Sequence, residues 1–114
     1  MLLESDKFMS DFSSICSLED VQSACEEGRL AKILLLPDEL GGREIPENVV
    51  YVPLHLLETK KNSTVELINV VRNGLNDIHV FPEYRGTSIV PAKISITAAR
   101  KGMPPEYELE IRIW

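Results

Sequence analysis

The last third of the chain restricts the possible folds most, because its side chains alternate between apolar and polar. Residues 92–98 and 107–113 are apolar or aromatic at every second position and polar or charged between them, and residues 78–84 follow the same alternation less strictly. Because neighbouring side chains of a strand point to opposite faces of its sheet, each segment predicts a strand with one buried face. The sequence "RKGMPP" between the last two segments predicts that they form an antiparallel hairpin.

Two helices, or one helix broken near Ser17, are predicted at the start of the chain. Residues 5–16 follow Ser5, a candidate N-cap, and place apolar side chains at the spacing of one helical face. Ser17 is followed three positions later by an aspartate, which is close to the spacing of a capping box. Gly28 suits the left-handed backbone that often ends a helix.

The middle of the chain predicts two strands and one further helix. The sequence "RLAKILLLP" is short, almost continuously apolar and closed by a proline, which is typical of a buried strand at residues 30–36. Residues 49–52 begin a second strand, which Pro53 restricts to a sheet edge or ends. The helix is predicted to begin at Ser63, where "STVE" has capping-box spacing, and to stop at Gly74.

Together these elements predict an α+β fold. The N-terminal helices and the one further helix are expected to pack on a mostly antiparallel sheet of four to five strands. A chain of 114 residues is close to the commonest size of a domain, so we expect a single domain over residues 1–114.

Charge is distributed unevenly along the chain. Residues 1–50 hold eleven acidic and four basic side chains, a net charge of −7, so the net charge of −6 of the whole chain comes from this half. A net negative chain without a basic stripe repels phosphate backbones, and we therefore expect no nucleic-acid partner. The acidic half either suits a basic protein partner or serves only solubility.

The sequence also predicts no association with a membrane. Its longest apolar run is far shorter than the roughly 20 residues that a membrane span needs. Glu4 and Asp6 interrupt the first residues before the apolar core of a signal peptide. We therefore expect a cytoplasmic protein.

The chain carries no local signature of a reaction. It has neither the GxxxxGK[ST] phosphate loop nor the GxGxxG fingerprint, and neither HExxH nor GxSxG. His55 and Glu58 would share one face of a helix, but they and the two cysteines lack the paired short spacings of metal ligands. We therefore expect no cofactor, no metal and no catalytic residue that the sequence identifies.

One stretch, "FPEYRG" at residues 81–86, gathers chemically versatile side chains. The simpler interpretation is a turn between two strands, in which the glycine relieves backbone strain. In the alternative interpretation, side chains of this stretch and a nearby histidine line a pocket that holds a carboxylate or phosphate through a guanidinium group. The candidate ligand-binding residues are His79, Glu83, Tyr84 and Arg85.

Trp114, the only tryptophan, conflicts with the alternation of the last strand. Its parity places it with Glu110 and Arg112 on the face assigned to water. Either the strand ends earlier and the ring folds back onto the domain, or another surface covers a residue type that is enriched where partners dock. Because the last strand is also a candidate sheet edge, we expect a homodimer with Trp114 at or near the contact.

The stretches "KILLLPDELGG", "NVVYVPLH" and "YRGTSIVPAKI" together resemble the small uncharacterised proteins encoded by bacterial mobile gene cassettes, including those of integrons. The resemblance implies a bacterial, cytoplasmic accessory protein and carries no shared activity or site residue. The missing catalytic signature, the acidic first half and the candidate sheet edge instead lead to the main hypothesis, a non-enzymatic, acidic protein-interaction module that self-associates. The alternative is a small-molecule binding protein or minor enzyme with a pocket near His79, Tyr84 and Arg85.

Overall fold

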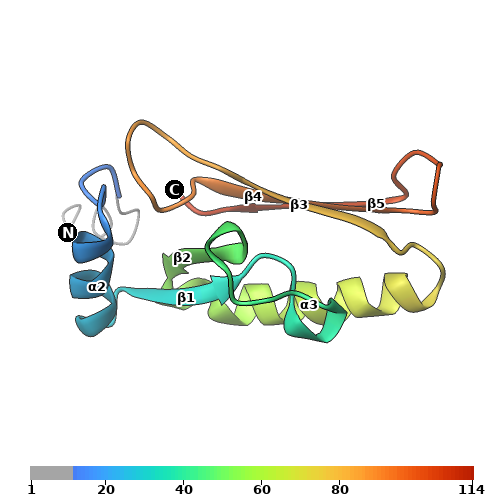
Figure 1. Ribbon diagram of the computed structural model, residues 1–114, viewed down its shortest axis with the longest axis horizontal. Helices are drawn as coiled ribbons and strands as arrows, with labels where there is room; N and C mark the ends of the chain where they lie inside the picture. Colours follow the sequence, from blue (N-terminus) through green and yellow to red (C-terminus); the bar gives the residue numbers. More distant parts are fainter. Residues whose placement is uncertain (1–11) are drawn as a thin grey trace, which may run out of the picture.

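The computed structural model describes residues 12–114, which form two layers with a short helix at one end (Figure 1). The helices and strands are α2 (Leu18–Glu26), β1 (Leu30–Leu34), β2 (Val49–Pro53), α3 (Leu57–Arg72), β3 (Asp77–Glu83), β4 (Lys93–Ala99) and β5 (Tyr107–Arg112), and the 3-10 turns are η1 (Asp38–Leu40), η2 (Pro46–Asn48) and η3 (Leu54–Leu56). One layer is an antiparallel sheet in the order β3-β4-β5. The other layer contains α3 and the antiparallel pair β1-β2, and α2 stands beside the start of β1.

The predicted α+β class is confirmed, but the five strands form two sheets instead of one. The pair β1-β2 runs from Leu30 opposite Pro53 to Leu34 opposite Val49, close to the predicted strand limits. Pro53 is the last residue of β2, as expected for a residue without an N–H, and the chain passes through η3 directly into α3. The pair is therefore tied to the helical layer and lies apart from the three-stranded sheet.

The main hydrophobic core lies between the two layers. Its central side chains, Ile94 and Ile96 of β4, are each 1 % exposed, and Ile111 of β5 is buried beside them. Glu110, on the opposite parity of β5, is exposed. The predicted core face of the C-terminal strands is therefore confirmed. The buried members of this core are Leu35, Val50, Val52, Leu67, Leu75, Ile94, Ile96, Ala98 and Ile111.

A second, smaller core lies under α2. The predicted N-cap is confirmed, because the Ser17 hydroxyl accepts a hydrogen bond from the backbone N–H of Asp20 at 3.2 Å. Gly28, just after the helix, has the predicted left-handed backbone with φ of 76°. Most of the helix predicted at residues 5–16, with its N-cap Ser5, lies outside the described residues, and residues 12–16 are not helical. The buried members of this second core are Phe12, Ile15, Val21, Ala24, Leu30 and Val90.

The predicted start of the third helix is wrong, although its predicted end is confirmed. Helix α3 begins at Leu57, immediately after η3, so the position of Pro53 sets its start. Ser63 lies buried inside the helix, and its hydroxyl donates to the backbone carbonyl of Lys60 at 2.8 Å instead of capping an N–H. The helix ends at the predicted place, with Gly74 in the left-handed region at φ of 100°.

Two serine substitutions test these helix starts. Ser17→Ala is expected to lower the free energy of unfolding by about 1 kcal/mol, because the Asp20 N–H then loses its hydrogen-bond partner in the first turn. Ser63→Ala is expected to change it by less than about 0.5 kcal/mol, since alanine has the higher helix propensity and no terminal N–H loses a partner. Urea denaturation of both variants measures the difference. A larger loss for Ser63→Ala would place the helix start at Ser63 after all.

The connections between strands of the larger sheet differ in length. The predicted hairpin is confirmed, because β4 and β5 pair antiparallel across the turn after Arg100. Residues 84–92 form a longer loop between β3 and β4, with Gly86 in the left-handed region. Tyr107 is the first residue of β5. Its hydroxyl donates a hydrogen bond to the Glu66 carboxylate of α3 at 2.7 Å, which links the larger sheet to the helical layer. Within residues 12–114, no helix combines the length and apolar character that crossing a membrane requires.

Candidate functional site

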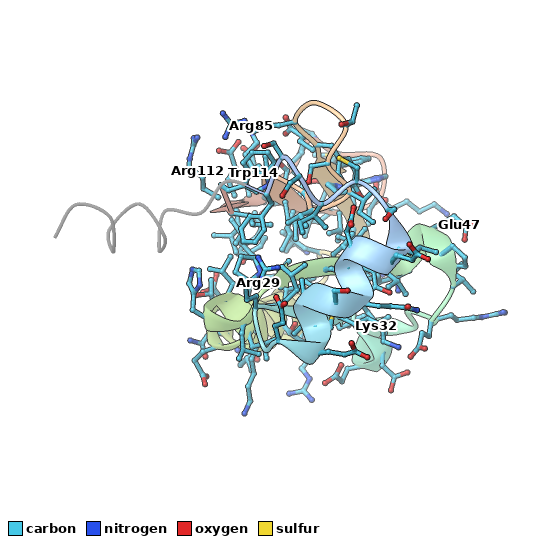
Figure 2. The ribbon with its side chains drawn as sticks, turned by 90° about the vertical axis from the view of Figure 1, so that its left-hand side faces the viewer. Arg29, Lys32, Glu47, Arg85, Arg112 and Trp114 are labelled. Atoms are coloured by element: carbon cyan, nitrogen blue, oxygen red, sulfur yellow. The ribbon has the colours of Figure 1, made fainter. Side chains whose placement is uncertain are left out.

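The loop between β3 and β4 and the adjacent strand ends enclose an open hollow of about 400 Å³, which we call the cationic hollow. Figure 2 shows Arg85, Arg112 and Trp114 gathered at this end of the molecule. Three of the four predicted ligand-binding residues and the predicted interface residue are therefore brought together. The residues that line the cationic hollow are Glu83, Tyr84, Arg85, Ala92, Lys93, Arg112 and Trp114.

Strand register places three of these charged side chains in a row across the sheet. Glu83 at the end of β3 lies opposite Lys93 of β4, and Lys93 lies opposite Arg112 of β5. The Lys93 Nζ is 3.3 Å from a carboxylate oxygen of Glu83 and 3.3 Å from one of Glu110. These hydrogen bonds, that to Glu83 first, raise the pKa of Lys93 above its ordinary value. Lys93 is therefore already engaged by two carboxylates.

Trp114 folds back onto its own chain beyond the end of β5. Its indole Nε1 donates to the backbone carbonyl of Val90 at 3.1 Å, and its ring meets Phe12 edge-on with centroids 6.2 Å apart. The guanidinium carbon of Arg85 lies 4.7 Å from the centre of the indole ring. Because β5 stops at Arg112, the parity of Trp114 no longer places it on the water face. A homodimer contact at Trp114 stays a prediction.

The two arginines of the cationic hollow differ from the lysine beside them. Among residues 12–114, no carboxylate forms an ion pair with Arg85 or Arg112. The lining carries three positive side chains and one negative one, Glu83, in a chain of net charge −6. Partial burial raises the pKa of Tyr84 above its ordinary value, and its hydroxyl, protonated at neutral pH in either case, can donate a hydrogen bond. The hollow is chemically suited to an anion.

His79, the fourth predicted residue, does not line the cationic hollow. It lies on the outer face of β3, where its Nε2 is 3.2 Å from a carboxylate oxygen of Asp77. Its ring stacks on that of Phe81, with centroids 5.9 Å apart and an interplanar angle of 4°. Four residues of extended strand place His79 about 13 Å from Glu83. It belongs to the exposed outer face of the sheet.

The sequence-based site lacked Lys93 and Arg112. Both were assigned to the water face of their strands, which is correct, but their neighbours across the sheet were not specified. The signal that identifies them is the register of the two hairpins, which places Glu83, Lys93 and Arg112 side by side. Register depends on the lengths of two loops and is therefore weakly encoded in any single strand.

A second surface feature is an apolar groove of about 370 Å³ between α2, β1, β2 and the loop before β2, which we call the acidic groove. Leu18, at the start of α2, is 67 % exposed, and Ile45, in the loop, is 45 % exposed. These are large apolar side chains held open to solvent on two different elements. The residues that line the acidic groove are Leu18, Lys32, Glu44, Ile45, Pro46, Val49 and Tyr51.

Hydrogen bonds hold the loop that carries Ile45 in place. The Asn48 side chain accepts from the backbone N–H of Leu36 at 2.8 Å and donates to the carbonyls of Leu36 and Arg43 at 3.0 and 2.9 Å. The Gly42 N–H donates to the carbonyl of Pro37 at 2.9 Å. The loop is therefore fixed at both ends, and the wall of the acidic groove that contains Ile45 is preformed.

Carboxylates lie in the lining of the acidic groove and beside lining residues in the sequence. Its one basic lining residue, Lys32, is paired with Glu44 at 2.8 Å. Glu19 and Glu47 are exposed and directly follow two lining residues, Leu18 and Pro46. Glu47 is visible at one side of α2 in Figure 2, with Lys32 beneath it. The groove thus has an apolar floor, one ion pair in its lining, and two exposed carboxylates next to lining residues in the sequence.

A further carboxylate near Leu18 is Asp20, in the first turn of α2. Its carboxylate accepts a hydrogen bond from the backbone N–H of Cys16 at 3.1 Å. This bond, followed by that with the Ser17 hydroxyl, lowers the pKa of Asp20 below its ordinary value. These hydrogen bonds belong to the N-cap of α2 at Ser17.

The residues considered as metal ligands remain separate. In the part of the chain that the structure describes, no three histidine, cysteine, aspartate or glutamate side chains gather closely enough to hold a metal ion. His55 lies in η3 and Glu58 in the first turn of α3. Comparisons with known proteins found no matching family model, no matching curated protein and no matching solved structure.

Proposed function

We propose that this protein is a non-enzymatic interaction module whose acidic groove binds a basic, amphipathic segment of a partner protein. The observation that carries the proposal is the exposure of Leu18 and Ile45 on two elements that flank one groove. An isolated exposed leucine is ordinary on protein surfaces. Two such side chains over one groove, with carboxylates near them in the sequence, are a surface suited to a partner.

The apolar floor supplies the affinity in this proposal. A leucine or valine side chain of the partner that enters the groove would be removed from water against Leu18, Ile45 and Val49. Full burial of one such side chain contributes about 1.5 to 3 kcal/mol. Because the loop before β2 is fixed by Asn48, little ordering of the groove opposes binding.

The carboxylates supply the preference for a basic segment. Glu19, Asp20 and Glu47 lie within two residues of lining residues, and residues 1–50 have a net charge of −7. Lysine or arginine residues that flank the apolar residue of the partner would face these carboxylates, which speeds association and disfavours acidic segments. Binding is accordingly expected to weaken as salt is added.

A peptide-binding measurement tests the proposal. We expect a short fluorescent peptide of alternating leucine and lysine to bind the wild-type protein, and Leu18→Ser to weaken its binding about tenfold, because the groove then loses an apolar wall. Fluorescence anisotropy gives both affinities. Leu54→Ser is the matched control, since Leu54 is 48 % exposed on η3, outside the groove.

Three results support or contradict the groove in this experiment. Unchanged binding to Leu54→Ser supports it. Equal binding to Leu18→Ser and wild type would show that the peptide lies elsewhere. Equal binding of a peptide in which glutamate replaces every lysine would remove the role of charge.

We also propose that the chain self-associates, with Trp114 at or near the contact. The edge strands of the larger sheet are β3 and β5, and no described strand pairs with their outer sides. Phe81 on β3 is 54 % exposed, and Trp114 directly extends the chain beyond β5. An open edge can pair with the same edge of a second copy around a two-fold axis.

Light scattering over a concentration series tests self-association. We expect the mass to rise from that of one chain to that of two as concentration increases, and deletion of Trp114 to shift this transition to higher concentration. Circular dichroism of the shortened chain verifies that it remains folded without the contact between Trp114 and Phe12. A wild-type protein with the mass of one chain at every concentration would contradict the proposal.

A further inference from the structure

We propose that the cationic hollow binds a small organic carboxylate with an apolar body. This site lies at the ends of β4 and β5, and none of its residues lines the acidic groove, so the inference is independent of the interaction with a basic partner. It rests on three features of the hollow, which are two arginines without carboxylate partners, an aromatic wall and the orientation of Arg85.

The charges of the cationic hollow favour an anion. Of its charged lining residues, three are positive and one is negative, although the whole chain has a net charge of −6. Lys93 is paired with Glu83 and Glu110, so few of its hydrogen-bond donors are left for a ligand. Arg85 and Arg112 keep their donors, and a guanidinium group can bind a carboxylate through two parallel hydrogen bonds.

The wall of the cationic hollow favours a ligand with an apolar body. Trp114, Tyr84 and Ala92 line it beside the arginines. Trp114 is held by its hydrogen bond to the carbonyl of Val90 and by its contact with Phe12, so its ring is fixed, with Arg85 over one of its faces. Most of the exposed lining is polar, so an apolar group next to the carboxylate would pack on the remaining apolar parts of Tyr84, Ala92 and Trp114, which an inorganic anion would leave in water.

Arg85 is oriented before any ligand arrives. Its guanidinium lies over the indole ring of Trp114 at 4.7 Å from the ring centre. This contact with the aromatic face restricts the side chain without consuming its hydrogen-bond donors. A ligand carboxylate therefore meets a donor group whose conformational freedom is already reduced, which lowers the entropy lost on binding.

Trp114 gives a direct readout, because it is the only tryptophan of the chain. We expect cyclohexanecarboxylate, which does not absorb in the tryptophan region, to change the fluorescence of wild-type protein with saturation. Cyclohexylmethanol, with the same body and no charge, is expected to bind at least about tenfold more weakly, because it lacks the charge-assisted hydrogen bonds. Inorganic phosphate at matched ionic strength is the third probe.

Variants identify the residues that bind. Arg85→Gln and Arg112→Gln are each expected to weaken cyclohexanecarboxylate about tenfold. Arg43→Gln removes the same charge from an exposed loop residue outside the hollow and is expected to leave the affinity unchanged. Because Arg85→Gln also alters the surroundings of Trp114, a shift of the melting temperature with cyclohexanecarboxylate serves as the second readout.

The outcomes separate the proposal from its alternatives. Saturable binding of cyclohexanecarboxylate that depends on Arg85 and Arg112 but not on Arg43 supports it. Equal affinity of all three arginine variants and wild type would overturn the site. If phosphate binds as tightly as cyclohexanecarboxylate, the ligand does not need an apolar body. If neither readout shows a saturable response, the whole proposal is wrong.

Discussion

Ile96→Ala is expected to lower the free energy of unfolding by about 2 to 5 kcal/mol, the range for removing most of a buried isoleucine side chain. Ile96 is 1 % exposed and lies on the central strand β4, with Val80 of β3 and Leu109 of β5 as its partners across the sheet. The loss combines the transfer of its methyl and methylene groups with the cavity that remains between the two layers. Guanidinium denaturation at equilibrium measures it.

Ser95→Ala is the matched control on the same strand. Ser95 faces the outer side of the sheet, and its only described side-chain hydrogen bond is a long one of 3.4 Å to Glu83. We expect this substitution to change the free energy of unfolding by less than about 0.5 kcal/mol. The opposite ranking of the two variants would mean that β4 is shifted by one residue, because such a shift exchanges the two faces.

Gly42→Ala is expected to lower the free energy of unfolding by about 2 to 3 kcal/mol, as overpacking in a fixed backbone does. A Cβ atom at Gly42 would overlap the carbonyl oxygen of Leu36 and lie 2.9 Å from that of Pro37. The backbone of Gly42 is not left-handed, so the cause is this close approach of two chain segments. Relief of the overlap would break the hydrogen bond from the Gly42 N–H to Pro37.

This substitution has a second expected consequence for the acidic groove. The displaced segment leads directly to Glu44 and Ile45, which line the groove, so Gly42→Ala is expected to weaken peptide binding as well as stability. Arg43→Ala, at the next and exposed position, is the control and is expected to change stability by less than about 0.5 kcal/mol. Equal thermal melting of wild type and Gly42→Ala would contradict the close packing of this loop.

The sequence predicted the parts of the fold that depend on local periodicity. The alternation around Ile96 and Ile111 identified the buried face of the sheet, and Ser17 and Gly74 marked a helix start and a helix end. These signals are local, because the period of side-chain directions follows from backbone geometry alone. The α+β class followed from them.

The errors arose where a local pattern competes with its surroundings. The capping-box spacing at Ser63 is present, but Pro53 and η3 already direct the chain into a helix at Leu57. The division of the strands into two sheets could not be predicted either, because alternation identifies the buried face of a strand but not the strand that pairs with it. It took the structure to show that β2 turns into α3 instead of joining the larger sheet.

The candidate sites show the same limit. Tyr84 and Arg85 could be proposed from their adjacency in the sequence, whereas Arg112 joins them only through the register of two hairpins. Leu18 and Ile45 belong to a helix and a loop that are far apart in the chain, and no sequence pattern links them. The acidic first half of the sequence supplies the carboxylates near the groove, but a basic partner stays a prediction.

The most direct test of the interaction module is a nuclear magnetic resonance titration of the isotope-labelled protein with the leucine-lysine peptide. The account predicts that amide shifts concentrate at Leu18, Ile45, Val49 and Tyr51 as the groove fills. The outer face of the larger sheet, represented by Phe81 and Thr97, is predicted to stay unchanged. Shifts that concentrate on that outer face, or no shifts in the groove when the peptide is in large excess, would contradict the account.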